Sequence, residues 1–261
     1  MYKSNSWINI DKNLLHGVNA DCHVRIRYGQ SFSFALSNTK SLFVVVGNIF
    51  ALGLFLSPIS TFKRIIRNRS TEQFSVSPYI YALLNCLICS WYGSPFISTD
   101  NVMVMTVNST GAVFQLVYII LFIVYAEKAI KVTVFGLLLA VFVLFAATVV
   151  GSLQIADGNI RRLSIGLLSG VSLISMFASP LFIINLVIRT KSVQFMPFYL
   201  SLSTFLMSTS FLLYGILNYD AFIYVPNGIG SILGITQLVL YCHYKGQSTD
   251  DSRESLIESY A

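Results

Sequence analysis

Seven uncharged stretches follow one another along this chain of 261 residues. After Lys40, charged residues and histidines occur singly or in short clusters, and the intervals between them contain 22 to 28 residues. A helix needs about 20 residues to cross the hydrocarbon core of a bilayer, whereas a strand of a membrane barrel needs only about ten. We therefore predict an all-α membrane protein whose seven transmembrane helices lie within 41–62, 73–99, 101–126, 132–156, 163–188, 192–219 and 221–242.

The composition agrees with a chain that faces lipid. Hydrophobic residues make up 55% of the sequence and charged residues only 11%, whereas a soluble domain has about a quarter of its residues charged. A net charge of +6 is also found in proteins that bind nucleic acid, but here the basic residues stand at the ends of the apolar intervals. We therefore expect the bilayer, and no nucleic acid, to be the partner of this surface.

The basic residues also predict an orientation. They gather in the first, third and fifth loops, as Lys63, Arg64, Arg67, Arg69, Lys128, Lys131, Arg189 and Lys191, whereas the second and sixth loops carry only Asp100 and Asp220. The positive-inside rule then predicts a cytosolic C-terminus and a lumenal or extracellular N-terminus. Arg161 and Arg162 in the fourth loop run against this rule, as do the five basic residues of 1–40.

The two ends of the chain are polar. Residues 1–40 contain no apolar segment of signal-peptide length, so we expect a flexible lumenal or extracellular extension. Residues 246–261 are polar and rich in serine, and we expect a disordered cytosolic tail. The four cysteines have no metal-ligand spacing, so no metal site and no cofactor is predicted.

The apolar intervals contain an internal repeat. The first and fifth share a Ser-Pro step followed by apolar and then basic residues, and the intervals after them each open with a proline. The third interval of each set carries an asparagine. The paired residues are separated by 122 positions for Pro58 and Pro180, and by 119 for Pro78 and Pro197 and for Asn108 and Asn227. Such regular spacing indicates the duplication of a three-helix unit.

The duplication predicts a 3+1+3 arrangement. Three crossings invert a unit, so two directly joined repeats would have opposite orientations in the membrane. The additional span restores the direction, which gives parallel repeats at 41–126 and 158–245 joined by a linker helix within 127–157. Parallel repeats of this kind place a substrate path between them near the bilayer midplane.

This pattern resembles the SWEET (MtN3/saliva) sugar transporters of plants. The resemblance covers about 41–245 and rests on the 3+1+3 order, the four repeat prolines, the asparagine pair and phrases such as KSVQFMPFYLSLSTF. It is closest to the hexose facilitators of the vacuolar membrane. The resemblance implies bidirectional sugar transport by alternating access, a homo-oligomer, and a vacuolar location in preference to the plasma membrane.

The asparagine pair is the main candidate for substrate binding. Asn108 and Asn227 are each about six residues into their helices, which places them about 9 Å inside. A primary amide both donates and accepts hydrogen bonds, as sugar hydroxyls do, although a lone asparagine often only joins two helices. Two symmetry-related amides favour substrate binding, and the resemblance implies that they are the sugar-binding pair.

The four repeat prolines are candidates for a gate. Pro58 and Pro180 lie inside predicted helices, where a proline removes a hydrogen bond and bends the chain. Pro78 and Pro197 stand near helix starts, where a proline is compatible with the helix. Each alone is compatible with a structural role, but the symmetric set indicates the hinges of a cytosolic gate. The resemblance implies the same assignment.

Four further residues correspond across the repeats. Cys89 and Phe211 match the positions at which SWEET transporters hold the sugar between two side chains. Taken alone, a cysteine such as Cys89 within a span is equally well explained as a small packing residue. Leu54 and Met176 each stand one turn before a proline of the predicted gate. The bulk of Leu54, Met176 and Phe211 predicts a monosaccharide substrate, with a sucrose-type facilitator as the alternative.

The opposite gate is predicted from the resemblance alone. It pairs Tyr92 with Asp220 on the lumenal side. The alternative for Asp220 is an ordinary solvated acid in a loop, and the sequence does not decide between the two.

The seven intervals contain no Asp, Glu, Lys, Arg or His. Carriers coupled to protons or ions generally need ionisable groups within the membrane, so we predict an uncoupled facilitator. No nucleophile within the intervals has a base or a metal site beside it, so we predict no enzyme. A seven-helix receptor would not explain the duplication. An amino-acid exporter of the PQ-loop type would have Pro-Gln where this chain has Pro58-Ile59 and Pro180-Leu181.

Overall fold

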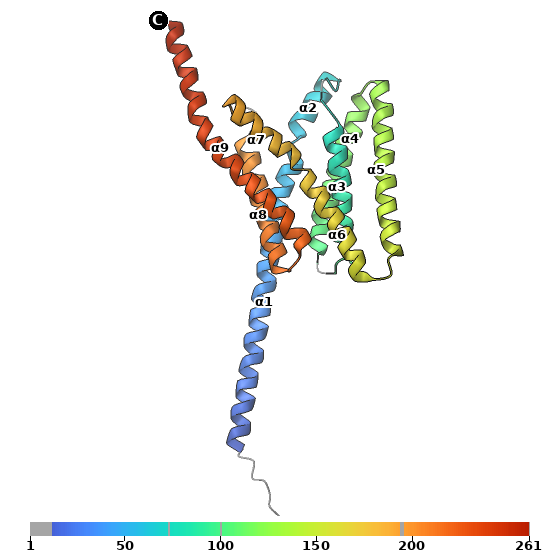
Figure 1. Ribbon diagram of the computed structural model, residues 1–261, viewed down its shortest axis with the longest axis vertical. Coiled ribbons are helices and arrows are strands. Elements are labelled where there is room, and N and C mark those ends of the chain that lie inside the picture. The colour runs from blue at the N-terminus through green and yellow to red at the C-terminus, as the bar shows by residue number, and fades with distance from the viewer. Residues whose placement is uncertain (1–11, 73, 100, 194–195, 261) are drawn as a thin grey trace, which may run out of the picture. The chain divides into compact units, whose positions relative to one another are not determined.

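The computed structural model describes residues 12–72, 74–99, 101–193 and 196–260, with side chains described between 34 and 245 within these ranges. Every regular element in them is a helix, which confirms the all-α class (Figure 1). The helices are α1 (Lys12–Leu56), α2 (Ile59–Asn68), α3 (Ser77–Tyr92), α4 (Val102–Tyr125), α5 (Lys128–Gln154), α6 (Gly158–Ser175), α7 (Ala178–Thr190), α8 (Phe198–Leu217) and α9 (Ala221–Tyr260).

In the described part of the chain these helices form seven rods, because α1 continues into α2 and α6 into α7 across short breaks. Among the described residues, six stretches are long and apolar enough to cross a membrane: Phe34–Asn68, Val102–Tyr125, Lys128–Gln154, Gly158–Thr190, Phe198–Leu217 and Ala221–Lys245. The remaining rod, α3, has only 16 residues and is about 24 Å long. It packs against α4, α5 and α6, so the protein surrounds much of its surface. The predicted 3+1+3 order of seven helices is confirmed.

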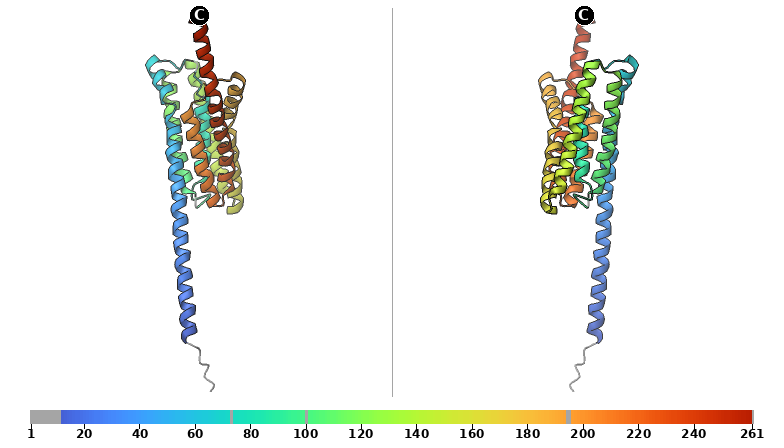
Figure 2. Two further views of the ribbon diagram at one scale, coloured as in Figure 1. Left: turned by 90° about the vertical axis from the view of Figure 1, so that its left-hand side faces the viewer. Right: turned by 90° about the vertical axis from the view of Figure 1, so that its right-hand side faces the viewer.

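The chain divides into two units, Met1–Leu42 and Phe43–Ala261. The helices of the second unit alternate in direction between two ends (Figure 2). We call one the basic end, because Arg64, Lys128 and Arg189 mark it, and the other the gate end, because Tyr92 and Asp220 lie there.

The described residues at the two ends of the chain are helical. Helix α1 begins at Lys12 and α9 continues to Tyr260. Neither the 1–40 segment nor the 246–261 segment contains a proline that would stop a helix. Residues 1–11 and 261 lie outside the described part of the chain.

The linker helix α5 packs on the first repeat. Its residues Val134 and Val141 are buried in the same apolar cluster as Leu83 of α3 and Ile119 of α4. Trp91 Nε1 of α3 donates a hydrogen bond of 3.0 Å to the hydroxyl of Ser152, near the end of α5. The other faces of α5 are apolar and exposed, as expected for a surface in contact with lipid.

A second apolar cluster joins the two repeats. It contains Val44 of α1, Tyr92 of α3, Phe211 and Tyr214 of α8, and Ile223 of α9. The contacts of α3 with α6 complete this interface. The two repeats therefore pack face to face, and their shared interface is where a substrate path should run.

Candidate functional site

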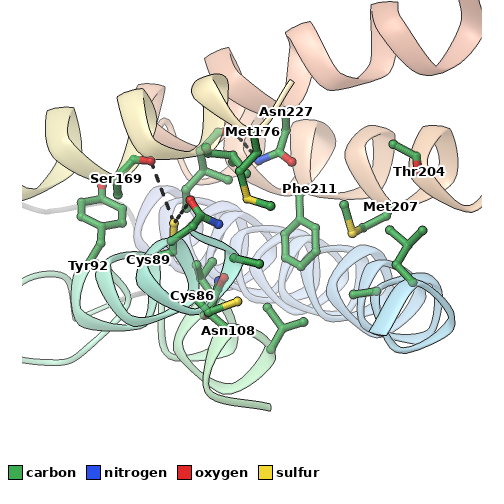
Figure 3. Close-up of a pocket in the computed structure, with 18 of the residues that line it drawn as sticks. Cys86, Cys89, Tyr92, Asn108, Ser169, Met176, Thr204, Met207, Phe211 and Asn227 are labelled. Carbon is green, nitrogen blue, oxygen red and sulfur yellow. Dashed lines mark hydrogen bonds between the residues drawn. The ribbon is translucent and has the colours of Figure 1, made fainter. Parts of the chain in front are cut away.

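A cavity of about 390 Å³ lies between the two repeats (Figure 3). Its size is within the range usual for small-molecule sites. Its walls come from both repeats, and none of its described lining residues belongs to α5. The structure places around it all six residues predicted to contact substrate, namely Leu54, Cys89, Asn108, Met176, Phe211 and Asn227.

The lining is apolar with a few neutral polar groups. None of the described residues that line the cavity is an Asp, Glu, Lys, Arg or His. The polar side chains are Asn85, Tyr92, Asn108, Gln115, Ser169, Thr204 and Asn227. Such a lining can exchange hydrogen bonds with an uncharged polyhydroxylated ligand, whereas a zwitterion would leave its charges without partners.

The two predicted asparagines are held in the same way. Asn108 Nδ2 donates to the carbonyl oxygen of Val104 at 2.9 Å, and Asn227 Nδ2 donates to that of Ile223 at 2.8 Å. Each bond runs back one helical turn and uses one of the two N–H groups of the amide. Figure 3 shows Asn108 and Asn227 on different sides of the cavity.

Cys89 and Phe211 each contact the first helix of the other repeat. The ring of Phe211 packs on Gly47 of α1, and the Cys89 thiol lies 3.9 Å from the carbonyl oxygen of Ser169 in α6. Gly47 and Ser169 are separated by 122 positions, as Pro58 and Pro180 are. The Cys89 thiol also donates to Asn85 Oδ1 at 3.7 Å. The internal symmetry of the repeat therefore extends to these contacts.

The first span of the first repeat is interrupted at Pro58, between α1 and α2. In an unbroken helix the carbonyl of Leu54 would accept the N–H of residue 58, which proline lacks. Instead it accepts both the backbone N–H and the hydroxyl of Ser57, at 3.2 and 2.8 Å. The next carbonyl, of Phe55, accepts the Tyr118 hydroxyl at 2.7 Å. Side chains of Ser57 and of Tyr118 in α4 thus satisfy the backbone carbonyls at the break.

The first span of the second repeat is also interrupted, but the break lies further ahead of its proline than the break at Pro58 does. Helix α6 ends at Ser175 and α7 begins at Ala178, so the break falls at Met176 and Phe177. Pro180 is the third residue of α7 and lines the cavity. Its missing N–H and its ring both affect the carbonyl four residues earlier, which belongs to Met176.

Pro78 and Pro197 occupy helix starts, as predicted. Pro78 lies in the first turn of α3, and Pro197 is the N-cap of α8. Both side chains are exposed. These positions accept proline without loss of a hydrogen bond, so of the four prolines only Pro58 and Pro180 lie at breaks in a span.

A buried cluster around Asp220 lies at the gate end, where Tyr92 and Asp220 were predicted to pair. The Tyr92 hydroxyl donates to both carboxylate oxygens of Asp220, at 2.8 and 2.6 Å. Asn101 Nδ2 and Arg162 Nη2 donate to Oδ2 at 2.7 and 2.9 Å. Asp220 is only 1% exposed, so it is not a solvated loop acid, and the predicted pairing with Tyr92 is present.

Several polar residues at these sites were not predicted from the sequence. Arg162 drew attention only as an exception to the charge pattern, and the structure gives it a partner. Asn85 and Gln115 are single polar residues in apolar stretches, and Asn101 follows the polar residues Ser98, Thr99 and Asp100. Asn85 accepts a hydrogen bond of 3.0 Å from the Ser172 hydroxyl of α6. The residues around Asn85 in the sequence do not predict this contact.

A sequence model of the family described as "Sugar efflux transporter for intercellular exchange" matches residues 41–130 and 163–249. The chain belongs to this family. The segment between the two matches, 131–162, contains most of α5. The family, known also as SWEET, consists of transporters rather than enzymes, which agrees with the prediction that the chain is not an enzyme.

Individual SWEET proteins resemble the chain over most of its length. "Bidirectional sugar transporter SWEET2" of Arabidopsis thaliana is 64% identical over 231 residues, which are 88% of this chain and 98% of the relative. "Bidirectional sugar transporter SWEET1" of the same plant is 50% identical over 217 residues, 82% and 88% of the two chains. A solved structure of a eukaryotic SWEET transporter superposes with a TM-score of 0.80 at 52% identity, over 81% of this chain and 99% of that one.

Proposed function

We propose that this chain is a bidirectional sugar transporter that moves a neutral monosaccharide such as glucose down its gradient, without ion coupling. The observation that carries this proposal is the cavity between the repeats, with one asparagine from each repeat and no charged lining residue among those described. The SWEET relatives, named as bidirectional sugar transporters, support it.

The test is glucose entry into liposomes that contain the purified full chain. Asn108→Ala and Asn227→Ala should each remove most of the saturable flux, because each amide is proposed to bind the sugar. Asn48→Ala is the control, since Asn48 lies in α1 at membrane depth and is not among the described lining residues of this cavity. Wild-type protein without glucose flux, or an equal loss in all three variants, would refute the proposal.

A monosaccharide rather than sucrose is proposed because bulky side chains narrow the cavity. Leu54, Met176 and Phe211 line it from three helical segments. Phe211→Ala should therefore increase sucrose flux relative to glucose flux in the same liposomes. Sucrose uptake by the wild type at the rate of glucose uptake would contradict this assignment.

We further propose alternating access, with the four repeat prolines as hinges of a gate at the basic end. The breaks at Pro58 and near Pro180 support this, since they let the basic-end halves of two spans move. The Asp220 cluster would be the opposing gate. Replacing Pro58 or Pro180 by alanine should slow transport, whereas Pro95→Ala, exposed in the turn at the gate end, should not.

The orientation and location are proposals as well. The basic end is assigned to the cytosol with the C-terminus, the N-terminus to the lumen or the exterior, and the chain to the vacuolar membrane rather than the plasma membrane. A fluorescent protein fused to the C-terminus, with protease protection of isolated vacuoles, tests both. We also propose a homo-oligomer, which cross-linking in native membranes would detect as a ladder of bands.

A further inference from the structure

We propose that Gln115 forms a second sugar-binding position on the transport path, between the asparagine pair and the basic end. This position belongs to the first repeat only. It rests on the proposed sugar transport. Gln115 would make the affinity for sugar offered at the basic end differ from the affinity for sugar offered at the gate end.

Gln115 lies further along the path than Asn108. It is on α4 seven residues after Asn108 and lines the same cavity. Seven residues are about two helical turns, so both side chains share one face of α4 and are about 10 Å apart along its axis. Because α4 runs from the gate end to the basic end, Gln115 is the deeper of the two from the gate end.

Gln115 also carries a hydrogen-bond acceptor without a partner. Its side chain is only 7% exposed, and its Oε1 is buried with no hydrogen-bond donor in reach among the described residues. Buried polar atoms are nearly always paired, and an exception needs an explanation. A glutamine that merely joined two helices would have its oxygen occupied by a protein donor. A sugar hydroxyl in the cavity would supply the missing donor.

The surroundings of Gln115 fix its position and supply an apolar face. Gly111 and Tyr118, one turn before and after it, both contact Phe55 of α1. A methyl group at Gly111 would stand only 2.6 Å from the Phe55 ring, so α4 and α1 are in close contact here. Phe55 itself lines the cavity, and an amide beside an aromatic ring can meet both the hydroxyls and the C–H face of a sugar.

The second repeat has no counterpart. The residue seven positions after Asn227 is Gly234, where a methyl group would stand 2.8 Å from the Cα of Phe205 in α8. No side chain fits there unless the backbone moves. The asparagines are therefore paired across the repeats, whereas the glutamine is single.

The test compares Gln115→Leu with Gln237→Leu in the full chain. Leucine nearly preserves the volume of glutamine and removes its hydrogen bonds. Gln237 of α9 is a matched control, because it is equally buried (6% exposed) but is not among the described lining residues of the cavity. Radiolabelled glucose influx and efflux are measured in cells that carry each variant at the plasma membrane, and KM is determined separately for sugar offered at each end.

For Gln115→Leu, KM for sugar offered at the basic end should rise about three- to tenfold, as the loss of one hydrogen bond implies. KM from the gate end should change less than twofold, and Gln237→Leu should match the wild type in both directions. Gln115→Asn, which keeps an acceptor, should give an intermediate KM. If Gln115→Leu does not reach the membrane, Gln115→Met takes its place.

Three results would overturn the inference while leaving the proposed function intact. They are a wild-type KM in both directions for Gln115→Leu, an equal rise in both directions, and an equal effect of Gln115→Leu and Gln237→Leu. Absence of saturable glucose flux in the wild type would instead refute the proposed function, and this inference with it.

Discussion

The ring of Phe211 in α8 rests on Gly47 in α1, so closely that a methyl group at Gly47 would stand 3.0 Å from the ring. Phe211 lines the cavity beside Asn108 and Asn227. The first helix of one repeat thus sets the position of an aromatic side chain that the other repeat places in the cavity. A side chain at Gly47 would press on the ring, which would have to shift by a few tenths of an ångström.

Gly47→Ala should therefore displace the ring and weaken sugar binding. Overpacking of this kind costs about 1–3 kcal/mol, so we expect a lower melting temperature together with a higher KM for glucose. Gly53→Ala is the control, since Gly53 lies in the same helix with no described atom within 4 Å of its added methyl. Indistinguishable KM values for the two variants would show that Gly47 does not position Phe211.

Tyr92→Phe should loosen the closure of the gate end. It removes the hydroxyl that donates to Asp220 but leaves the bonds from Asn101 and Arg162. A hydrogen bond to a charged group contributes about 1.5–3 kcal/mol, so the population open at the gate end should rise by about ten- to a hundredfold. A membrane-impermeant thiol reagent added at that side should label Cys89 in the cavity faster, as measured by mass spectrometry.

The control for this experiment is Tyr219→Phe, because Tyr219 is close in sequence to Asp220 but 93% exposed. An unchanged rate of Cys89 labelling in Tyr92→Phe would mean that the remaining donors are sufficient to hold the gate closed.

An imposed proton gradient should leave the final sugar distribution unchanged. The described residues that line the cavity include no acid, lysine, arginine or histidine that could carry a proton with the sugar, and ion-coupled carriers generally need such groups. The measurement is the steady-state ratio of glucose inside and outside liposomes, with and without the gradient. Accumulation of glucose against its concentration in response to the gradient would contradict passive transport.

The loop between α2 and α3 should contribute stability that disappears in acid. Hydrogen bonds from Arg64, at 3.1 and 2.6 Å, and from Asn68 hold the pKa of Glu72 below its usual value. A carboxylate whose pKa is lowered by folding stabilises the protein above its unfolded value of about 4.3, and this contribution is lost as the pH falls through the lowered folded value.

Glu72→Gln should accordingly lower the melting temperature of the purified protein near neutral pH and have no effect in strong acid, where Glu72 is protonated. The effect should be small, because the ion pair is exposed and screened by water. A deficit that is the same at both pH values would assign the stability to packing of the loop rather than to the charge of Glu72.

The sequence was sufficient to predict the spans, the repeat and six of the residues around the cavity. The reason is that lipid imposes a length and an absence of charge on each span, and duplication marks equivalent residues such as Asn108 and Asn227. The break at Pro58 was also predictable, because a proline inside a helix removes a backbone hydrogen bond. The break in the second repeat lies at Met176 and Phe177, before Pro180, and this offset from the proline has no counterpart in the first repeat.

Contacts that join distant segments were not predictable. The burial of Asp220 depends on Asn101, which is its equivalent in the first repeat at the spacing of 119, and on Arg162, 58 residues away. The repeat spacing relates Asn101 to Asp220 but does not reveal that the two side chains bind each other, and Arg162 has no local pattern that reveals either contact. Gln115 was overlooked because its equivalent, Gly234, has no side chain, so the comparison of the repeats did not mark it.

The pairing of Arg162 with Asp220 has a consequence for biogenesis. Arg162 is synthesised 58 residues before its counter-ion, so it has no carboxylate partner until Asp220 has been made. Translation has to proceed through α8 before Asp220 exists and can neutralise it. A nascent chain that ends at the linker helix contains Tyr92 and Asn101 but not the carboxylate that they bind. The first repeat therefore depends on the second for the acceptor of these two hydrogen bonds.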